Sequence, residues 1–183
     1  MVYITERTTL INPAAMLAHL PLRAGLRVGD LGCGGHGQIA AAAARAVGDS
    51  GTVYLVDIRK SALAELVKKT RLIGIRNVKS IWANLELVGA TGLPAGTLDA
   101  AMLINVMFQA QDKASVFLET KRLLKSGGAL LVVDWKTAAT RLGPPSDHRV
   151  PPNELEAYAR AAGFQLRETF DAGPYHYGLV FTR

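Results

Sequence analysis

The chain has a single cysteine, Cys33, among its 183 residues. A disulfide within the chain is therefore excluded, and so is a zinc cluster built from cysteine ligands. The histidines show no recognisable metal-ligand spacing, so we expect no metal site. Because disulfides are rare in reducing compartments, the scarcity of cysteine favours a cytoplasmic location.

Long apolar runs are also missing. No stretch approaches the roughly 20 apolar residues that span a bilayer, and the first ten residues lack the pattern of a signal peptide. The formal net charge is +6, but lysines and arginines occur singly or in pairs without interleaved aromatics. We therefore expect no membrane span, and the charge pattern argues against a nucleic-acid partner.

Strand and helix patterns alternate along the sequence. Helices are expected over Pro13–Leu20, Gln38–Val47, Ser61–Ile73, Lys113–Lys125 and from an Asn153 cap to Ala162. Strands are expected over Leu26–Leu31, Gly51–Asp57, Asn77–Trp82, Leu98–Ile104, Ala129–Trp135, Phe164–Phe170 and Tyr175–Thr182. Five strand–helix units before a hairpin predict an α/β fold: a doubly wound, Rossmann-like, seven-stranded, mostly parallel sheet with a C-terminal antiparallel hairpin strand. We expect one domain over residues 1–183, with a helical segment, residues 1–22, over the site.

A glycine-rich loop follows the first predicted strand. Its residues, Gly32-Cys33-Gly34-Gly35-His36-Gly37, satisfy the dinucleotide fingerprint G-x-G-x-x-G, in which glycines let the backbone approach a ligand. Asp30 stands two residues before the first glycine. A carboxylate there would repel a dinucleotide phosphate and attract a cation, such as the ammonium and sulfonium of S-adenosylmethionine.

Three segments resemble motifs of the class I S-adenosylmethionine-dependent methyltransferases. They are Val28–Gly34, the fourth-strand segment Leu98–Asn105 and the turn Arg122–Gly128 before the fifth strand. The chain is methyltransferase-11/25-like and is most similar to ubiquinone/menaquinone-type small-molecule methyltransferases. The resemblance implies S-adenosyl-L-methionine as cofactor and a small-molecule methyl acceptor.

The resemblance also implies which residues bind the cofactor. They are Asp30, Gly32, Cys33, Gly34, Asp57, Ile58, Asn84, Leu85 and Asn105. Asp57 would accept hydrogen bonds from the ribose hydroxyls, although a carboxylate there could also cap a helix or hold a turn. Asp30 would hold the methionine end of the cofactor or, alternatively, accept from N–H groups of the loop.

The sequence departs from the family pattern at two positions. His36 stands where a third glycine is common, and Asn84 stands where an acid is common. Asn84 and Leu85 would flank the adenine, or form an ordinary strand end. Asn105 would lie near the methionine moiety, or cap a buried strand.

No residue can be assigned as catalytic. His148 or His176 is a hypothetical general base on pKa grounds, for an acceptor that must lose a proton. Candidate acceptor contacts are Tyr3, Phe108, Trp135, His148, Arg149, Tyr175 and His176. Arg149 would pair with an acidic substrate or be a plain surface cation.

Other functions stay open at this point. The glycine fingerprint and Asp57 also suit an NAD-dependent oxidoreductase, which the terminal hairpin opposes. A non-catalytic relative that binds the cofactor and an RNA methyltransferase are further alternatives, and a homodimer could complete the site.

Overall fold

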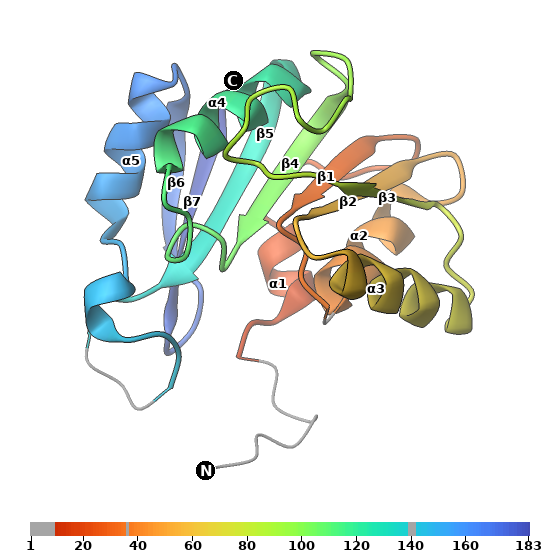
Figure 1. The fold of residues 1–183 in the computed structure, drawn as a ribbon, viewed down its shortest axis with the longest axis horizontal. Helices are drawn as coiled ribbons and strands as arrows, with labels where there is room; N and C mark the ends of the chain where they lie inside the picture. The colour runs from red at the N-terminus through yellow and green to blue at the C-terminus, as the bar shows by residue number, and fades with distance from the viewer. Residues whose placement is uncertain (1–9, 36, 139–141) are drawn as a thin grey trace.

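The computed structural model describes residues 10–35, 37–138 and 142–183, and shows one twisted sheet with helices on both faces (Figure 1). The strands are β1 (Arg27–Leu31), β2 (Thr52–Asp57), β3 (Val78–Trp82), β4 (Leu98–Ile104), β5 (Leu124–Trp135), β6 (Gln165–Asp171) and β7 (His176–Thr182). The helices are α1 (Pro13–Leu17), α2 (Gln38–Val47), α3 (Lys60–Leu72), α4 (Lys113–Leu123) and α5 (Pro152–Ala161), with a 3₁₀ turn at Ser146–His148.

The strand order is β3-β2-β1-β4-β5-β7-β6. Strands β1 to β5 run parallel, and β7 pairs antiparallel with both β5 and β6. The chain winds outward from β1 to β3 and then returns to place β4 against the other side of β1. The doubly wound α/β sheet with its C-terminal hairpin is therefore confirmed.

Each face of the sheet has its own apolar core. Helices α1, α2 and α3 cover one face, and α4 and α5 cover the other. Helix α2 buries Ala40, Ala43, Ala44 and Val47, whose spacing of three or four residues forms one apolar stripe. Because alanine is small, the α2 backbone can approach the sheet closely.

The end of helix α4 and the start of helix α5 both come earlier in the chain than expected. Helix α4 ends at Leu123, since Leu124 is extended (φ −73°, ψ 146°) and already pairs with Leu98 of β4. Helix α5 begins at Pro152 after the cap residue Pro151, so Asn153 lies inside the first turn. Proline at the first helical position has no N–H to leave unsatisfied.

Helix α1 is capped as expected, with the Asn12 side chain accepting a hydrogen bond from the Ala15 N–H at 3.2 Å. It ends at Leu17, whereas the sequence suggested Leu20.

The expectation of five strand–helix units is wrong at β3, because residues 83–97 connect β3 to β4 without a helix. The buried Glu119 of α4 holds this connection by accepting from the Gly89 N–H (2.8 Å) and the Thr91 hydroxyl (2.6 Å). Arg122 donates to the same carboxylate and to the Leu93 carbonyl. Burial alone would raise the pKa of Glu119, but these hydrogen bonds outweigh it and hold the pKa below its usual value.

Candidate functional site

The candidate site lies where the winding of the sheet reverses. Strands β1 and β4 are neighbours, yet their connections lead to opposite sides, and ligands of open α/β sheets bind outside the carboxyl ends of strands at such a point. Asp30 lies near the end of β1, Asp57 ends β2 and Asn105 follows β4. The fold thus brings these three predicted residues to one edge.

The glycine loop after β1 contacts both neighbouring connections. Gly32 has a φ of +78°, and a Cβ built on it would lie 2.6 Å from a methyl carbon of Val106, in the connection after β4. On the other side, the Gly34 N–H donates to Oδ2 of Asp57 at 2.8 Å. Only a residue without a side chain fits at Gly32 unless Val106 moves, so the backbone itself lies next to the connection after β4.

Asp30 is a buried carboxylate, 5% exposed, and the residues that the structure describes provide no hydrogen bond to it. Burial, together with the charge of Asp57, raises the pKa of Asp30 to about 7. A buried carboxylate of this kind is stabilised by a cation. The ammonium and sulfonium groups of S-adenosylmethionine fit that requirement.

Asp57 is also buried, and it has partners within its own turn. The Arg59 N–H donates to Oδ1 at 2.8 Å, and the Arg59 guanidinium Nε lies 3.4 Å from the same oxygen. Asp57 therefore holds the turn that leads into α3. Since a carboxylate oxygen accepts more than one hydrogen bond, this role leaves room for ribose hydroxyls. The next residue, Ile58, is 58% exposed, so its apolar side chain is free to contact a flat ring.

The pair after β3, Asn84 and Leu85, has contacts within the protein itself. Asn84 uses its side-chain carbonyl to accept from the Glu86 N–H at 2.9 Å. Leu85 is buried in the core on the α4 and α5 face of the sheet. The Asn84 oxygen has a second lone pair and its amide nitrogen has two N–H groups, so both can still contact a ligand.

Asn105 has the strained backbone expected of a site residue. Its φ of +56° is the only positive value for a non-glycine residue in the described part of the chain. Its side-chain Oδ1 is buried without a hydrogen-bond partner, while its N–H donates to the Val133 carbonyl at 2.8 Å. An unpaired buried oxygen in a residue with a positive φ is a candidate ligand contact.

Asp134, on β5, supports the connection after β4, and the sequence analysis gave it no role. Its Oδ2 accepts from the Met107 N–H (2.9 Å) and the Phe108 N–H (3.2 Å). Burial raises its pKa to about 6, although these hydrogen bonds lower it. The sequence feature that could have identified Asp134 is that it is a single acid within an apolar strand.

Trp135 and His176 face each other across the β5–β7 pair, with ring centroids 4.2 Å apart. His176 is fully buried, and neither ring nitrogen has a hydrogen bond. Burial, then the charges of Lys136 and Arg149, lowers its pKa to about 4. His176 is therefore neutral near pH 7 and is a weak base.

Arg149 is not a surface cation, because it is buried and four of its five guanidinium N–H groups are used within the protein. Its guanidinium donates to four backbone carbonyls of the preceding loop, those of Lys136, Ala138, Leu142 and Pro144. Arg149 thus shapes the loop that borders the candidate acceptor side.

The other candidate residues are dispersed. His148 is exposed on the 3₁₀ turn, and Phe108 and Tyr175 are half-buried. Tyr3 and His36 lie outside the described residues. Among described residues, no group of three or more acids, histidines or cysteines could hold a metal, and no helix is long and apolar enough to cross a bilayer.

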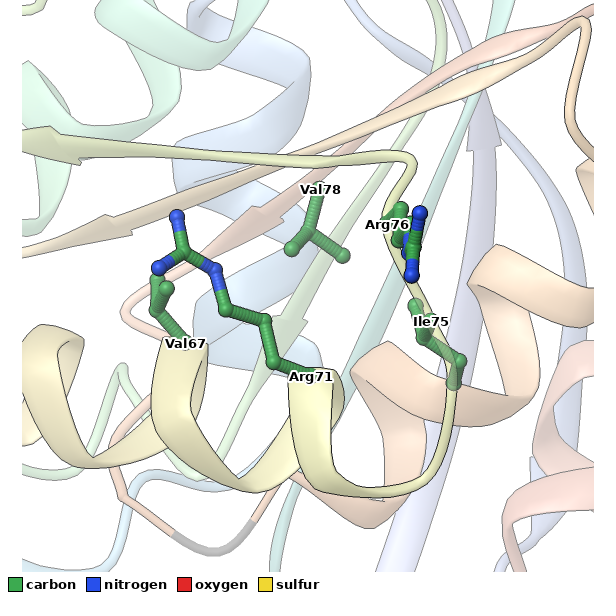
Figure 2. Close-up of a pocket in the computed structure, with 5 residues that line it drawn as sticks. All are labelled: Val67, Arg71, Ile75, Arg76 and Val78. Carbon is green, nitrogen blue, oxygen red and sulfur yellow. The ribbon is translucent and has the colours of Figure 1, made fainter.

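Two surface hollows lie beside α3, and the lining of one of them includes Gly37 of the glycine loop. One, of about 440 Å³, lies between α3 and β3 and is shown in Figure 2. The other, of about 610 Å³, lies between α1, α2 and the end of α3.

Comparisons with known proteins agree with this geometry. A family model described as "Methyltransferase domain" matches residues 22–160. The ubiquinone/menaquinone biosynthesis C-methyltransferase UbiE of Cronobacter sakazakii is 38% identical over 115 residues, which cover 62% of this chain and 44% of that protein. The chain thus spans less than half the length of this curated relative.

Solved structures show the same fold. A SAM dependent methyltransferase from Aquifex aeolicus aligns with a TM-score of 0.87 at 24% identity, over 94% of this chain and 90% of that one. The [4+2]-cyclase SpnF aligns with a TM-score of 0.79 at 18% identity, over 93% and 80% of the two chains. The reported relatives give no support to the oxidoreductase alternative. The chain belongs to the class I S-adenosylmethionine-dependent methyltransferases, and its cofactor is S-adenosylmethionine.

Proposed function

We propose that this protein transfers a methyl group from S-adenosylmethionine to a small-molecule acceptor. The observation that carries the proposal is Asp30, a buried carboxylate without a described hydrogen-bond partner beneath the glycine loop. UbiE, the curated relative, is named as a C-methyltransferase of ubiquinone/menaquinone biosynthesis. A carbon acceptor of that class is therefore the first to test.

The cofactor contacts that we propose follow the order of the strands. Asp30 holds the cationic methionine end, and Gly32, Cys33 and Gly34 line it with backbone. Asp57 accepts from the ribose hydroxyls. Asn105, with its unpaired Oδ1, contacts the methionine moiety.

The adenine contacts lie farther out along the sheet. Ile58 packs on one face of the ring with its exposed side chain. Asn84 and Leu85 flank the ring, and the Asn84 side-chain amide contacts its polar edge.

In the proposed mechanism the protein does not have to activate the methyl group. When bound, the cofactor supplies an already activated methyl group on a sulfonium. The chain's residues align donor and acceptor, exclude water and hold the cofactor's charge. His176, neutral near pH 7, remains a hypothetical proton acceptor, although its pKa of about 4 makes it weak. His148 remains an alternative.

Three further expectations belong to this proposal. The chain acts as one domain over residues 1–183, and the N-terminal segment expected over the site is residues 1–22, of which residues 1–9 lie outside the described part of the chain. It works in the cytoplasm, where its single cysteine stays reduced. A homodimer is the first assembly state to test.

Thermal unfolding with added ligands tests the cofactor part. We expect S-adenosylmethionine and S-adenosylhomocysteine to raise the melting temperature and NAD to leave it unchanged, because a ligand of the folded state stabilises it. Asp57→Ala should remove the shift. Stabilisation by NAD alone would overturn the proposal.

Methyl transfer needs its own assay. Incubation with labelled S-adenosylmethionine and quinol-type acceptors should give labelled product. The cyclase SpnF has the same fold, so binding without turnover on any acceptor would favour a relative that uses the cofactor differently.

A further inference from the structure

The C-terminal end of α3 lies at one margin of the molecule (Figure 1), and two aliphatic side chains are exposed there. Leu72 is 76% exposed and Ile73 is 54% exposed. They are consecutive residues, and Gly74 then turns the chain towards β3. We call Leu72 and Ile73 the apolar tip. Two adjacent aliphatic side chains that are this exposed can be buried only against a membrane or another molecule.

Positive charge surrounds the apolar tip. Lys68 and Arg71 precede it on α3, Arg76 follows it, and Arg45 lines the same hollow as the tip. The side chains of these four residues have no hydrogen bond or ion pair among the described residues. Glu65 is the single acid between residues 60 and 76, and it pairs with Lys69 at 2.7 Å. The tip is therefore ringed by uncompensated cations.

A hollow next to the tip is also lined by both basic and aliphatic side chains. Figure 2 shows Arg71, on α3, and Arg76, before β3, on either side of Val78. Val67 and Ile75 complete the lining of this space of about 440 Å³. Guanidinium groups above an aliphatic floor suit a ligand that is anionic at one end and apolar at the other.

We propose that the apolar tip and its ring of cations dock the protein on an anionic phospholipid surface. Leu72 and Ile73 enter the boundary between headgroups and acyl chains, while the arginines and Lys68 contact lipid phosphates. Protruding aliphatics combined with basic residues supply the two contributions that peripheral membrane binding requires.

The composition of the patch favours lipid over the other anionic partners. Single-stranded nucleic acid is held by aromatic side chains that stack on bases, and the tip has aliphatic side chains instead. A second copy of the chain would bring the same cations together, because the net charge of the protein is +6.

The tip lies at the opposite end of α3 from Asp57. Helix α3 begins three residues after Asp57, and its 13 residues carry the chain about 20 Å away from that end. The glycine loop is nearer to the tip, because Lys69 donates to the Gly35 carbonyl at 3.0 Å and Gly37 lines the same hollow as Leu72 and Ile73. The inference does not depend on the proposed methyl transfer.

Vesicle sedimentation with the full chain tests the proposal. We expect binding to vesicles of phosphatidylcholine with about 30% phosphatidylserine, and at least about tenfold weaker binding to phosphatidylcholine alone. Salt raised from about 0.1 M towards 1 M should release the protein, because the screening length falls from about 10 Å to 3 Å.

Variants separate the two contributions. Leu72→Ser with Ile73→Ser should weaken vesicle binding about tenfold, and Arg71→Glu with Arg76→Glu should weaken it at least as much. The matched control is Leu87→Ser with Val88→Ser, since that pair is 61% and 52% exposed and follows the acidic Glu86. We expect the control to change binding by less than about twofold.

The readouts keep this proposal apart from the proposed function. Stabilisation by S-adenosylhomocysteine, measured on each variant, reports whether the fold and cofactor site are intact. Equal vesicle binding by the wild type and the tip variant would overturn the docking proposal, as would absence of wild-type binding. Binding of an RNA oligomer in preference to anionic vesicles would also overturn it.

Discussion

At the scale of single residues, the buried carboxylate of Asp30 favours cofactor binding but lowers the stability of the cofactor-free protein. Its pKa is raised from 3.8 to about 7, so in that pH range the folded protein keeps a proton that the unfolded chain has lost. The stabilising effect of this residue is therefore complete below pH 3.8 and is lost as the pH rises through about 7. At higher pH the native state contains a buried charge that calls for a cation.

Asp30→Asn should raise the melting temperature of the cofactor-free protein at pH 8. The gain is at most about 4 kcal/mol, the free-energy equivalent of the raised pKa. The same variant should bind S-adenosylmethionine at least about tenfold more weakly, since it lacks the charge that pairs with the ammonium. Differential scanning fluorimetry and calorimetry at pH 6 and pH 8 measure both effects.

The pH dependence supplies the control for Asp30. Wild-type affinity should rise between pH 6 and pH 8 as the carboxylate ionises, and the affinity of the asparagine variant should stay flat. A variant that binds as tightly as the wild type at pH 8 would show that Asp30 does not contact the cofactor.

Gly32→Ala should destabilise the protein and weaken cofactor binding. A Cβ there meets Val106 at 2.6 Å, in addition to the strain of the positive φ, which costs about 1–2 kcal/mol. Gly74→Ala is the matched control, because Gly74 has a φ of +80° and nothing within 4 Å of the added carbon. Urea denaturation should show a larger loss for Gly32→Ala, and only this variant should lose cofactor affinity.

At the scale of elements, Arg149 organises the loop between β5 and α5. Arg149→Met leaves the carbonyls of Lys136, Ala138, Leu142 and Pro144 without this donor. We expect a loss of about 3 kcal/mol in the free energy of unfolding, because hydrogen bonds to a buried charge are worth about 1.5–3 kcal/mol each and water replaces part of them.

Limited thermolysin digestion locates the effect of Arg149→Met. Cleavage should accelerate between residues 136 and 150 and nowhere else. Arg160→Met, which removes an exposed pair with Glu156, should change stability by less than about 1 kcal/mol. Equal digestion of the two variants would contradict the anchoring role.

Element boundaries show where local patterns are insufficient. The Ser126-Gly127-Gly128 turn signal predicted the stop of α4 after Lys125. The structure places these residues inside β5, whose start is fixed by pairing of Leu124 with Leu98. That pairing joins segments far apart in the sequence, so no local propensity encodes it. Asn12, in contrast, caps α1 as predicted, because a cap depends only on its own turn.

At the scale of the whole molecule, strand order concentrates the ligand site at one edge of the sheet. Hydrogen exchange with and without S-adenosylhomocysteine should therefore show protection over the connections after β1, β2, β3 and β4. The hairpin β6–β7 and the end of α3 should exchange at unchanged rates. Protection at the end of α3 would place the ligand in the hollows beside that helix instead.

The sequence by itself determined the alternation of strands and helices, the glycine loop and the acids at the ends of β1 and β2. These features depend on periodicity and turn chemistry, which act between neighbours in the chain. Their order along the chain also predicted the doubly wound sheet and the terminal hairpin.

Only the tertiary structure decided which side chains are buried and with what partners. In the folded protein Leu85 lies in the core and Arg149 donates to loop carbonyls. Asn105 has a positive φ, and Leu72 is exposed. Burial and hydrogen bonding of these residues depend on segments that meet only when the sheet has formed. Distant contacts of this kind leave no periodic signal in the sequence, which is why they had to be read from the fold.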